Sequence, residues 1–170
     1  MSDRQTKRDQ FKNEEKKSAG KLLLPGVLAL LAIVTGAAWL LLGSGGTAGA
    51  RTVTAAEDGV IRLAASDFDG GRAQFFRYES RRGPITFFVV RSQDGVIRAA
   101  FDACDVCYKE KKGYRQEGDA MICNNCGQSF PSNMVNIVKG GCNPSPLSRQ
   151  LAGGQVLIQV AALEQGARYF

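Results

Sequence analysis

Hydrophobic positions divide the chain into one long apolar block and a body of short apolar runs. Residues 22–42 (LLLPGVLALLAIVTGAAWLLL) contain no formally charged side chain. At ~1.5 Å per residue, a helix over this block covers about 30 Å, the hydrocarbon thickness of a bilayer. The block therefore predicts one transmembrane helix. Pro25 would lie near its first turn, and Trp39 would lie at the far membrane interface.

Two other interpretations of the block remain open. A buried core helix would need more protein around it than this chain offers, because the block is apolar on all sides. A cleaved signal peptide is the stronger rival, since residues 48–50 (AGA) resemble a small-residue cleavage site. The apolar run is nevertheless longer than the ~7–15 residues usual in signal peptides. An anchor and a signal peptide both direct the following residues across the membrane.

The segments on either side of the apolar block indicate its orientation across the membrane. Residues 1–21 are polar and hold seven Lys/Arg against four acidic residues, which predicts a disordered basic tail that stays in the cytoplasm. Residues 43–52 are a Gly-rich linker, and residues 53–170 form the extracytoplasmic domain. We therefore expect a single-pass protein of the cytoplasmic membrane that contacts the lipid bilayer. Its C-terminal domain would be periplasmic, or extracellular in a cell with one membrane.

The body has mostly strand-like patterns. The turn sequence at residues 92–95 (SQDG) predicts a hairpin over residues 85–101. Residues 145–151 (SPLSRQL) predict a helix with Pro146 in its first turn. The predicted class is a small, mainly β (α+β) metal-binding domain. Its expected strands are residues 60–63, 74–78, 85–90, 96–101 and 156–160.

Composition excludes several functions. The net charge of +6 is not gathered with aromatic residues into a basic stripe, so we expect no nucleic-acid partner. Histidine is absent, which excludes imidazole ligands and catalytic triads that contain histidine. All five cysteines lie between Cys104 and Cys142. Such clustering indicates one site rather than a scattered disulfide framework.

Four of these cysteines form two C-x-x-C pairs. Cys104 and Cys107 are separated by fifteen residues from Cys123 and Cys126, a spacing typical of metal sites. Two cysteines three positions apart can turn both sulfurs toward one ion, and two such pairs complete a tetrahedral site. Gly127 follows the second pair, where a positive φ would let backbone N–H groups approach the sulfurs.

The pattern leaves the ion and the fifth thiol open. Zinc, mononuclear iron and small iron–sulfur clusters all accept four thiolates. The two C-x-x-C pairs could also form disulfides or a thioredoxin-like redox pair, although no βαβ pattern surrounds them. Cys142 lies in a constrained loop at residues 140–146 (GGCNPSP). It could bind a cofactor, act as a redox partner or be an ordinary buried thiol.

Four longer motifs surround the cysteines: residues 101–108 (FDACDVCY), 112–114 (KGY), 121–128 (MICNNCGQ) and 140–144 (GGCNP). They resemble the FtrD-like family of membrane iron–sulfur-containing proteins, and the resemblance extends over about residues 57–170.

The resemblance implies an iron–sulfur or related metal centre on Cys104, Cys107, Cys123 and Cys126, with Cys142 as a further cofactor-binding residue. It also implies a role in bacterial ferrous-iron uptake, beside a membrane iron permease and a periplasmic iron-binding protein. Electron transfer is the expected task. The sequence contains no nucleophile–base pair and no phosphate-binding loop, which favours an electron-transfer or metal-binding component over an enzyme.

Overall fold

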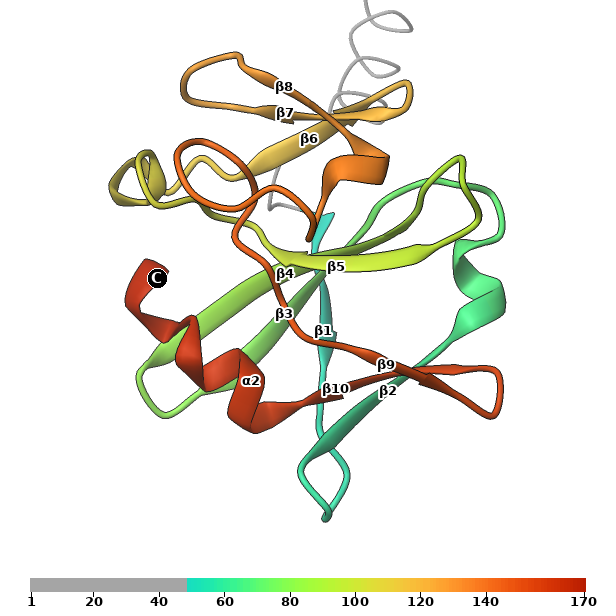
Figure 1. Cartoon of the computed structure of the whole chain (residues 1–170). Coiled ribbons are helices and arrows are strands. Elements are labelled where there is room, and N and C mark those ends of the chain that lie inside the picture. The colour runs from blue at the N-terminus through green and yellow to red at the C-terminus, as the bar shows by residue number, and fades with distance from the viewer. Residues whose placement is uncertain (1–48) are drawn as a thin grey trace, which may run out of the picture. The chain divides into compact units, whose positions relative to one another are not determined.

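The computed structural model describes residues 49–170, which belong to a compact unit of residues Gly45–Phe170. This part of the chain is mainly β, as the sequence predicts, and Figure 1 shows its strands arranged in three sheets. The first sheet has the order β1(Arg51–Val53), β3(Gln74–Ser80), β4(Gly83–Arg91), β5(Ile97–Phe101). The second has the order β2(Val60–Ala64), β10(Gln155–Gln159), β9(Gln150–Ala152). The third has the order β6(Tyr114–Glu117), β7(Ala120–Cys123), β8(Ser129–Pro131).

Strand β4 is buried on both faces, which explains its continuous apolar sequence. Phe87 and Val89 face one hydrophobic cluster, which also contains residues of β2, β10 and the helix α2(Val160–Gln165). Phe88 and Val90 face a second cluster, formed with Tyr114 and two of the cysteines. Because neighbouring side chains of a strand point to opposite faces, one strand supports both clusters. The cysteines are thus packed against the central sheet.

The predicted hairpin over residues 85–101 is confirmed by the antiparallel pairing of β4 with β5. Its turn is held by Asp94, which accepts hydrogen bonds from Arg98 Nη1 at 2.8 Å and Nη2 at 2.7 Å. Arg98 also donates to Ser92 Oγ. The Arg98 side chain is only 7% exposed, so its charge depends on Asp94 for compensation.

Asp94→Asn is expected to lower the thermal stability of the protein at neutral pH. Arg98 holds the pKa of Asp94 well below its usual range, so this carboxylate stabilises the fold at neutral pH and loses its contribution as the pH falls into the acid range. Asp58→Asn is the matched control, because Asp58 pairs with Arg62, whose side chain is 39% exposed. Thermal melts at pH 7 should show the larger loss for Asp94→Asn. Equal losses would contradict the role given to the burial of Arg98.

The predicted helix over residues 145–151 is wrong. This segment runs extended along the edge of β5, where Pro146 forms an isolated antiparallel bridge with Ala100. Ser145 N donates to Ala103 O at 2.9 Å, and Leu147 N donates to Ala99 O at 3.2 Å. Prolines fit this arrangement, because at an edge only alternate residues need to donate inward. The unpaired edge of β5 therefore outweighs the local helix signal.

A short helix that the pattern did not predict, α2, follows β10 directly, and a 3-10 turn at Ala167–Tyr169 follows α2. Strand β1 begins at Arg51, within the segment expected to be linker. Within residues 49–170, no helix combines the length and apolar character needed to cross a bilayer. The expected membrane helix at residues 22–42 and the tail at residues 1–21 lie outside the described residues.

Candidate metal centre

Three separate segments bring the five cysteines to one region. Cys104 and Cys107 lie in the loop after β5. Cys123 is the last residue of β7, and Cys126 lies in the turn between β7 and β8. Cys142 lies in the long loop that precedes β9. All five are free thiols in the structure, so neither C-x-x-C pair forms a disulfide there.

The sulfurs form two overlapping groups of three. Cys104, Cys107 and Cys142 form one group, and Cys107, Cys123 and Cys126 form the other. Within each group all sulfurs lie within 4.8 Å of one another. The four cysteines of the C-x-x-C pairs are therefore brought together, but as parts of two groups joined at Cys107 rather than as one group of four.

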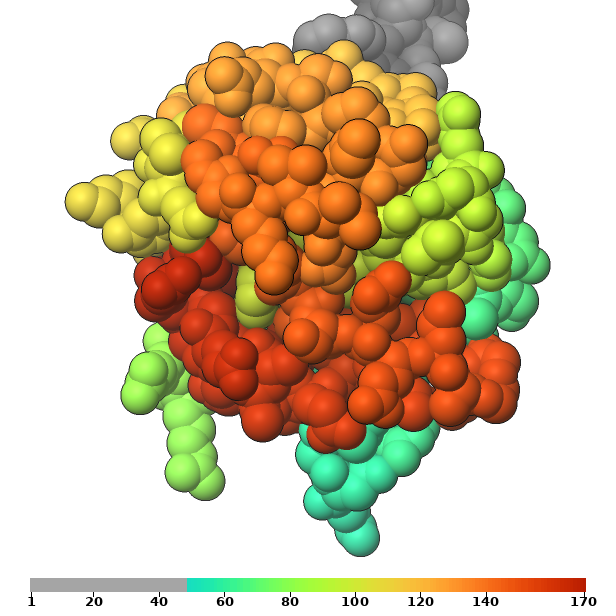
Figure 2. All heavy atoms as spheres, viewed as in Figure 1, coloured from blue at the N-terminus to red at the C-terminus, as the bar shows by residue number. Residues whose placement is uncertain are grey.

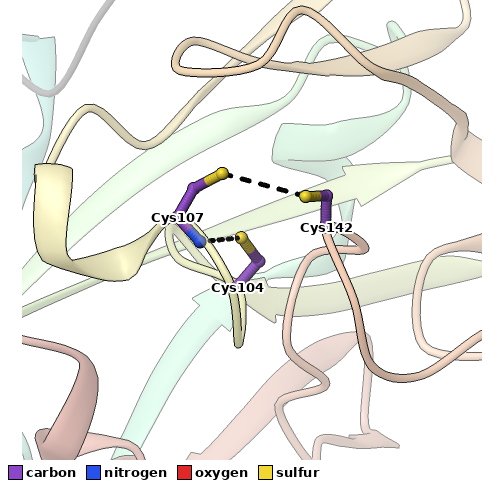
Figure 3. Close-up of side chains that lie close together, drawn as sticks. All are labelled: Cys104, Cys107 and Cys142. Atoms are coloured by element: carbon purple, nitrogen blue, oxygen red, sulfur yellow. Dashed lines mark hydrogen bonds between the residues drawn. The ribbon is translucent and has the colours of Figure 1, made fainter.

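One sulfur–sulfur distance is compatible with a shared metal ion. Cys107 Sγ lies 3.8 Å from Cys142 Sγ, and Figure 3 shows these two side chains pointing toward each other. Sulfurs bound at ~2.3 Å to a tetrahedral ion are separated by about 3.8 Å. A disulfide would require a separation of about 2.05 Å. The spacing excludes a disulfide and allows both sulfurs, which are 35 positions apart in the chain, to bind one ion; two thiols in ordinary contact have the same spacing.

Local backbone geometry turns each pair toward the site. Cys107 N–H donates to Cys104 Sγ at 3.1 Å, which closes the first turn (Figure 3). In the second turn Gly127 has φ +74° and its N–H donates to Cys123 O at 2.9 Å. The positive φ expected at this glycine is confirmed. The first pair reaches a similar turn without a following glycine, since Tyr108 begins a 3-10 turn there.

Burial and backbone dipoles act on the thiols in opposite directions. Burial raises the pKa of Cys123 to about 11 and that of Cys142 to about 12. The Gln128 N–H holds the pKa of the exposed Cys126 below its usual range. Clustered thiolates with raised pKa values need a cation to stay deprotonated, and a bound metal supplies that charge. Metal binding to this site should accordingly strengthen as the pH rises.

Comparison with known proteins identifies the family. The family described as "Membrane iron-sulfur containing protein FtrD-like" matches residues 68–170, which include all five cysteines. This chain belongs to the FtrD-like family. Neither a curated protein nor a solved structure matches it. The family assignment expected from the four motifs is confirmed.

The donor set of this FtrD-like chain fits the centre that its family description names. Soft thiolates are the ligands of iron–sulfur clusters, and they also suit mononuclear iron and zinc. With no histidine in the sequence, the two groups of three sulfurs are the described sites with this character. The site can therefore hold a metal through sulfur alone.

A buried polar connection fixes the cysteine segments relative to one another. Tyr114 N–H donates to Asp102 Oδ1 at 2.7 Å, and the Tyr114 hydroxyl donates to the Cys142 carbonyl at 2.6 Å. Asp102 lies two residues before Cys104, so this connection links the first C-x-x-C turn, β6 and the Cys142 loop. Burial raises the pKa of Asp102 to about 7, and its Oδ2 has no hydrogen-bond partner among the described residues.

The sequence pattern did not predict this connection. Other polar side chains near the cysteines make local or long-range hydrogen bonds of their own. Asn124 Nδ2 donates to Lys112 O at 2.9 Å, and Asn143 Nδ2 donates to Gly140 O at 2.9 Å. Asp105 accepts from the Tyr169 hydroxyl at 2.7 Å. The short motif at residues 112–114, which contains Gly113 and Tyr114, was the sequence signal nearest to this connection.

Proposed function

We propose that this FtrD-like protein is a membrane-anchored electron-transfer component of a ferrous-iron uptake system, with iron or an iron–sulfur cluster held by its cysteines. The observation that carries the proposal is the convergence of five sulfurs in two groups that share Cys107. The family description supports an iron–sulfur centre and a membrane setting. An iron centre supplies one-electron redox chemistry.

The cysteines differ in their access to solvent. This difference suits electron exchange with a partner through the exposed side of the centre. Cys104 and Cys123 are each 1% exposed and keep water from the inner side of the centre. Cys126 is exposed in its turn. A partner can approach this outer side closely without entering the protein. The exposed residues 109–112 (KEKK) would give an acidic partner a docking surface next to it.

The sequence and the family resemblance support a proposed membrane setting and proposed partners. The apolar block at residues 22–42 would anchor the chain, and the basic residues 1–21 would keep the N-terminus in the cytoplasm. The cysteine domain would then work on the outer side of the cytoplasmic membrane. A membrane iron permease and a periplasmic iron-binding protein are the proposed partners.

Metal analysis and a visible spectrum of the full-length protein test this proposal. The chain would be purified anaerobically in detergent, and iron, zinc and acid-labile sulfide would be measured in the same sample. We expect coloured protein that contains iron and loses its visible absorption on treatment with a chelator. Colourless protein with stoichiometric zinc would contradict the redox role and support a structural zinc module that docks on a permease.

Thiol labelling separates the proposal from a thiol–disulfide redox domain. Metal-bound cysteines should resist alkylation in the native protein and react after chelation. A C-x-x-C pair that is alkylated rapidly before chelation, and that exchanges with a small disulfide, would favour the redox-domain alternative.

A further inference from the structure

A cavity of about 410 Å³ opens beside the cysteine cluster. Its walls come from the tip of the β3–β4 hairpin, the first C-x-x-C loop and the C-terminal segment. In Figure 2 the hairpin tip (green) projects beside the C-terminal segment (red), and the yellow loop lies above them. Three cysteines reach the cavity wall: Cys104, Cys107 and Cys123. The volume is in the range of small-molecule sites, about 300–1,000 Å³.

Aromatic side chains form part of the wall. Tyr108 and Tyr169 pack edge to face with ring centroids 5.8 Å apart. Phe170 lies beside them in the wall and packs on Phe101 at 6.4 Å. The Tyr169 hydroxyl is fixed by its hydrogen bond to Asp105. These preplaced rings offer a surface on which a planar aromatic molecule can stack.

The charged residues of the wall are mainly cations. Arg77, Arg82 and Lys111 line the cavity, and Asp102 is the one acidic side chain among the lining residues. Arg77 is paired with Glu79 at 2.6 Å. Arg82 and Lys111 are exposed and form no ion pair with another described residue. Two uncompensated cations at the mouth of an aromatic cavity favour an anionic ligand.

Asp102 adds a polar feature to the wall of the same cavity. Its Oδ1 accepts from Tyr114 N, while its Oδ2 is buried and has no partner among the described residues. Asp102 Oδ2 lies against Gly113, where an added Cβ would clash with it, so this oxygen is not counted as a ligand contact. Cations and aromatic rings therefore surround one volume.

We propose that this cavity binds a small planar aromatic molecule that carries an anionic group. Its ring stacks among Tyr108, Tyr169 and Phe170. Its anionic group faces Arg82 and Lys111. The ligand would share the cavity with three of the five cysteines. Binding itself does not depend on which metal the cysteines hold.

Two flavins test the proposal, because they share one ring system and differ in charge. Flavin mononucleotide (FMN) carries a phosphate, and riboflavin does not. Dissociation constants would be measured with the full-length protein in detergent from the quenching of flavin fluorescence. FMN is expected to bind about tenfold more tightly than riboflavin, which corresponds to modest charge interactions with two partly solvated cations.

Two double variants test whether Arg82 and Lys111 cause the preference for FMN. Arg82→Gln with Lys111→Gln removes two charges from the cavity wall and should abolish the preference for FMN. Arg81→Gln with Lys109→Gln removes two exposed charges from the neighbouring positions, which do not line the cavity, and should leave the preference unchanged. The two double variants have the same net charge, so long-range attraction affects both equally.

The outcomes separate this proposal from the proposed function. The proposal is overturned if neither flavin binds below millimolar concentration, if the two flavins bind equally, or if both double variants lose the preference alike. Iron content would be measured in each sample. A sample that contains zinc but still prefers FMN would overturn the proposed iron centre and support the proposed ligand site in the cavity. A sample that contains iron but binds both flavins equally would support the iron centre and overturn the ligand site.

Discussion

Cys107→Ser is expected to lower the metal content of the purified protein at least tenfold. Cys107 is the one cysteine in both groups of sulfurs, so its loss leaves only two thiolates in each group. A hydroxyl group is a poor substitute for a soft thiolate ligand. The metal content per folded protein would be measured by inductively coupled plasma mass spectrometry, and circular dichroism would check that each variant is folded.

Cys126→Ser and Cys142→Ser are the matched controls for this prediction. Each of these cysteines belongs to a single group, and each is at least partly accessible, like Cys107. Both control variants should retain more metal than Cys107→Ser, because one complete group remains in each. Equal metal content in all three variants would show that Cys107 is not the shared ligand.

Gly113→Ala is expected to destabilise the protein by about 3 kcal/mol or more. A Cβ at this position would lie 2.4 Å from Asp102 Oδ2, and the backbone φ of +61° is unfavourable for alanine. The clash would push Asp102 away from Tyr114 N and so disturb the connection to the Cys142 loop. Chemical denaturation would measure the change in the free energy of unfolding, and the metal content should fall as well.

Gly118→Ala separates the clash from the backbone strain. Gly118 has a similar φ of +56°, but no atom lies within 4 Å of a Cβ added there. The strain alone should cost about 1–2 kcal/mol. The excess loss in Gly113→Ala then measures the contact with Asp102. If the two variants lose equal stability, Asp102 moves away freely and does not fix the cysteine segments.

The sequence predicts those parts of the fold that depend on local pattern. The apolar run in β4 was recognisable because both faces of this strand are buried. The turn at residues 92–95 was recognisable because its residue types favour a tight turn. The two C-x-x-C pairs and Gly127 also carry their signal within a few residues.

Contacts between distant segments could not be predicted in this way. The approach of Cys142 to Cys107 depends on the extended pairing of residues 145–147 with β5, and the local pattern there favoured a helix. The link from Asp102 to Tyr114 depends on the way the chain returns after the first C-x-x-C turn. The grouping of sulfurs around Cys107 thus needed the structure, whereas the metal-binding character of the cysteines did not.

X-ray absorption at the iron edge of the anaerobically purified full-length protein is the most direct test of the central claim. If the converging cysteines hold iron, sulfur should be the only nearest neighbour of the metal, and Cys107→Ser should abolish the signal. Nearest neighbours of nitrogen or oxygen, or an iron signal that survives in Cys107→Ser, would contradict an iron centre built from these thiolates.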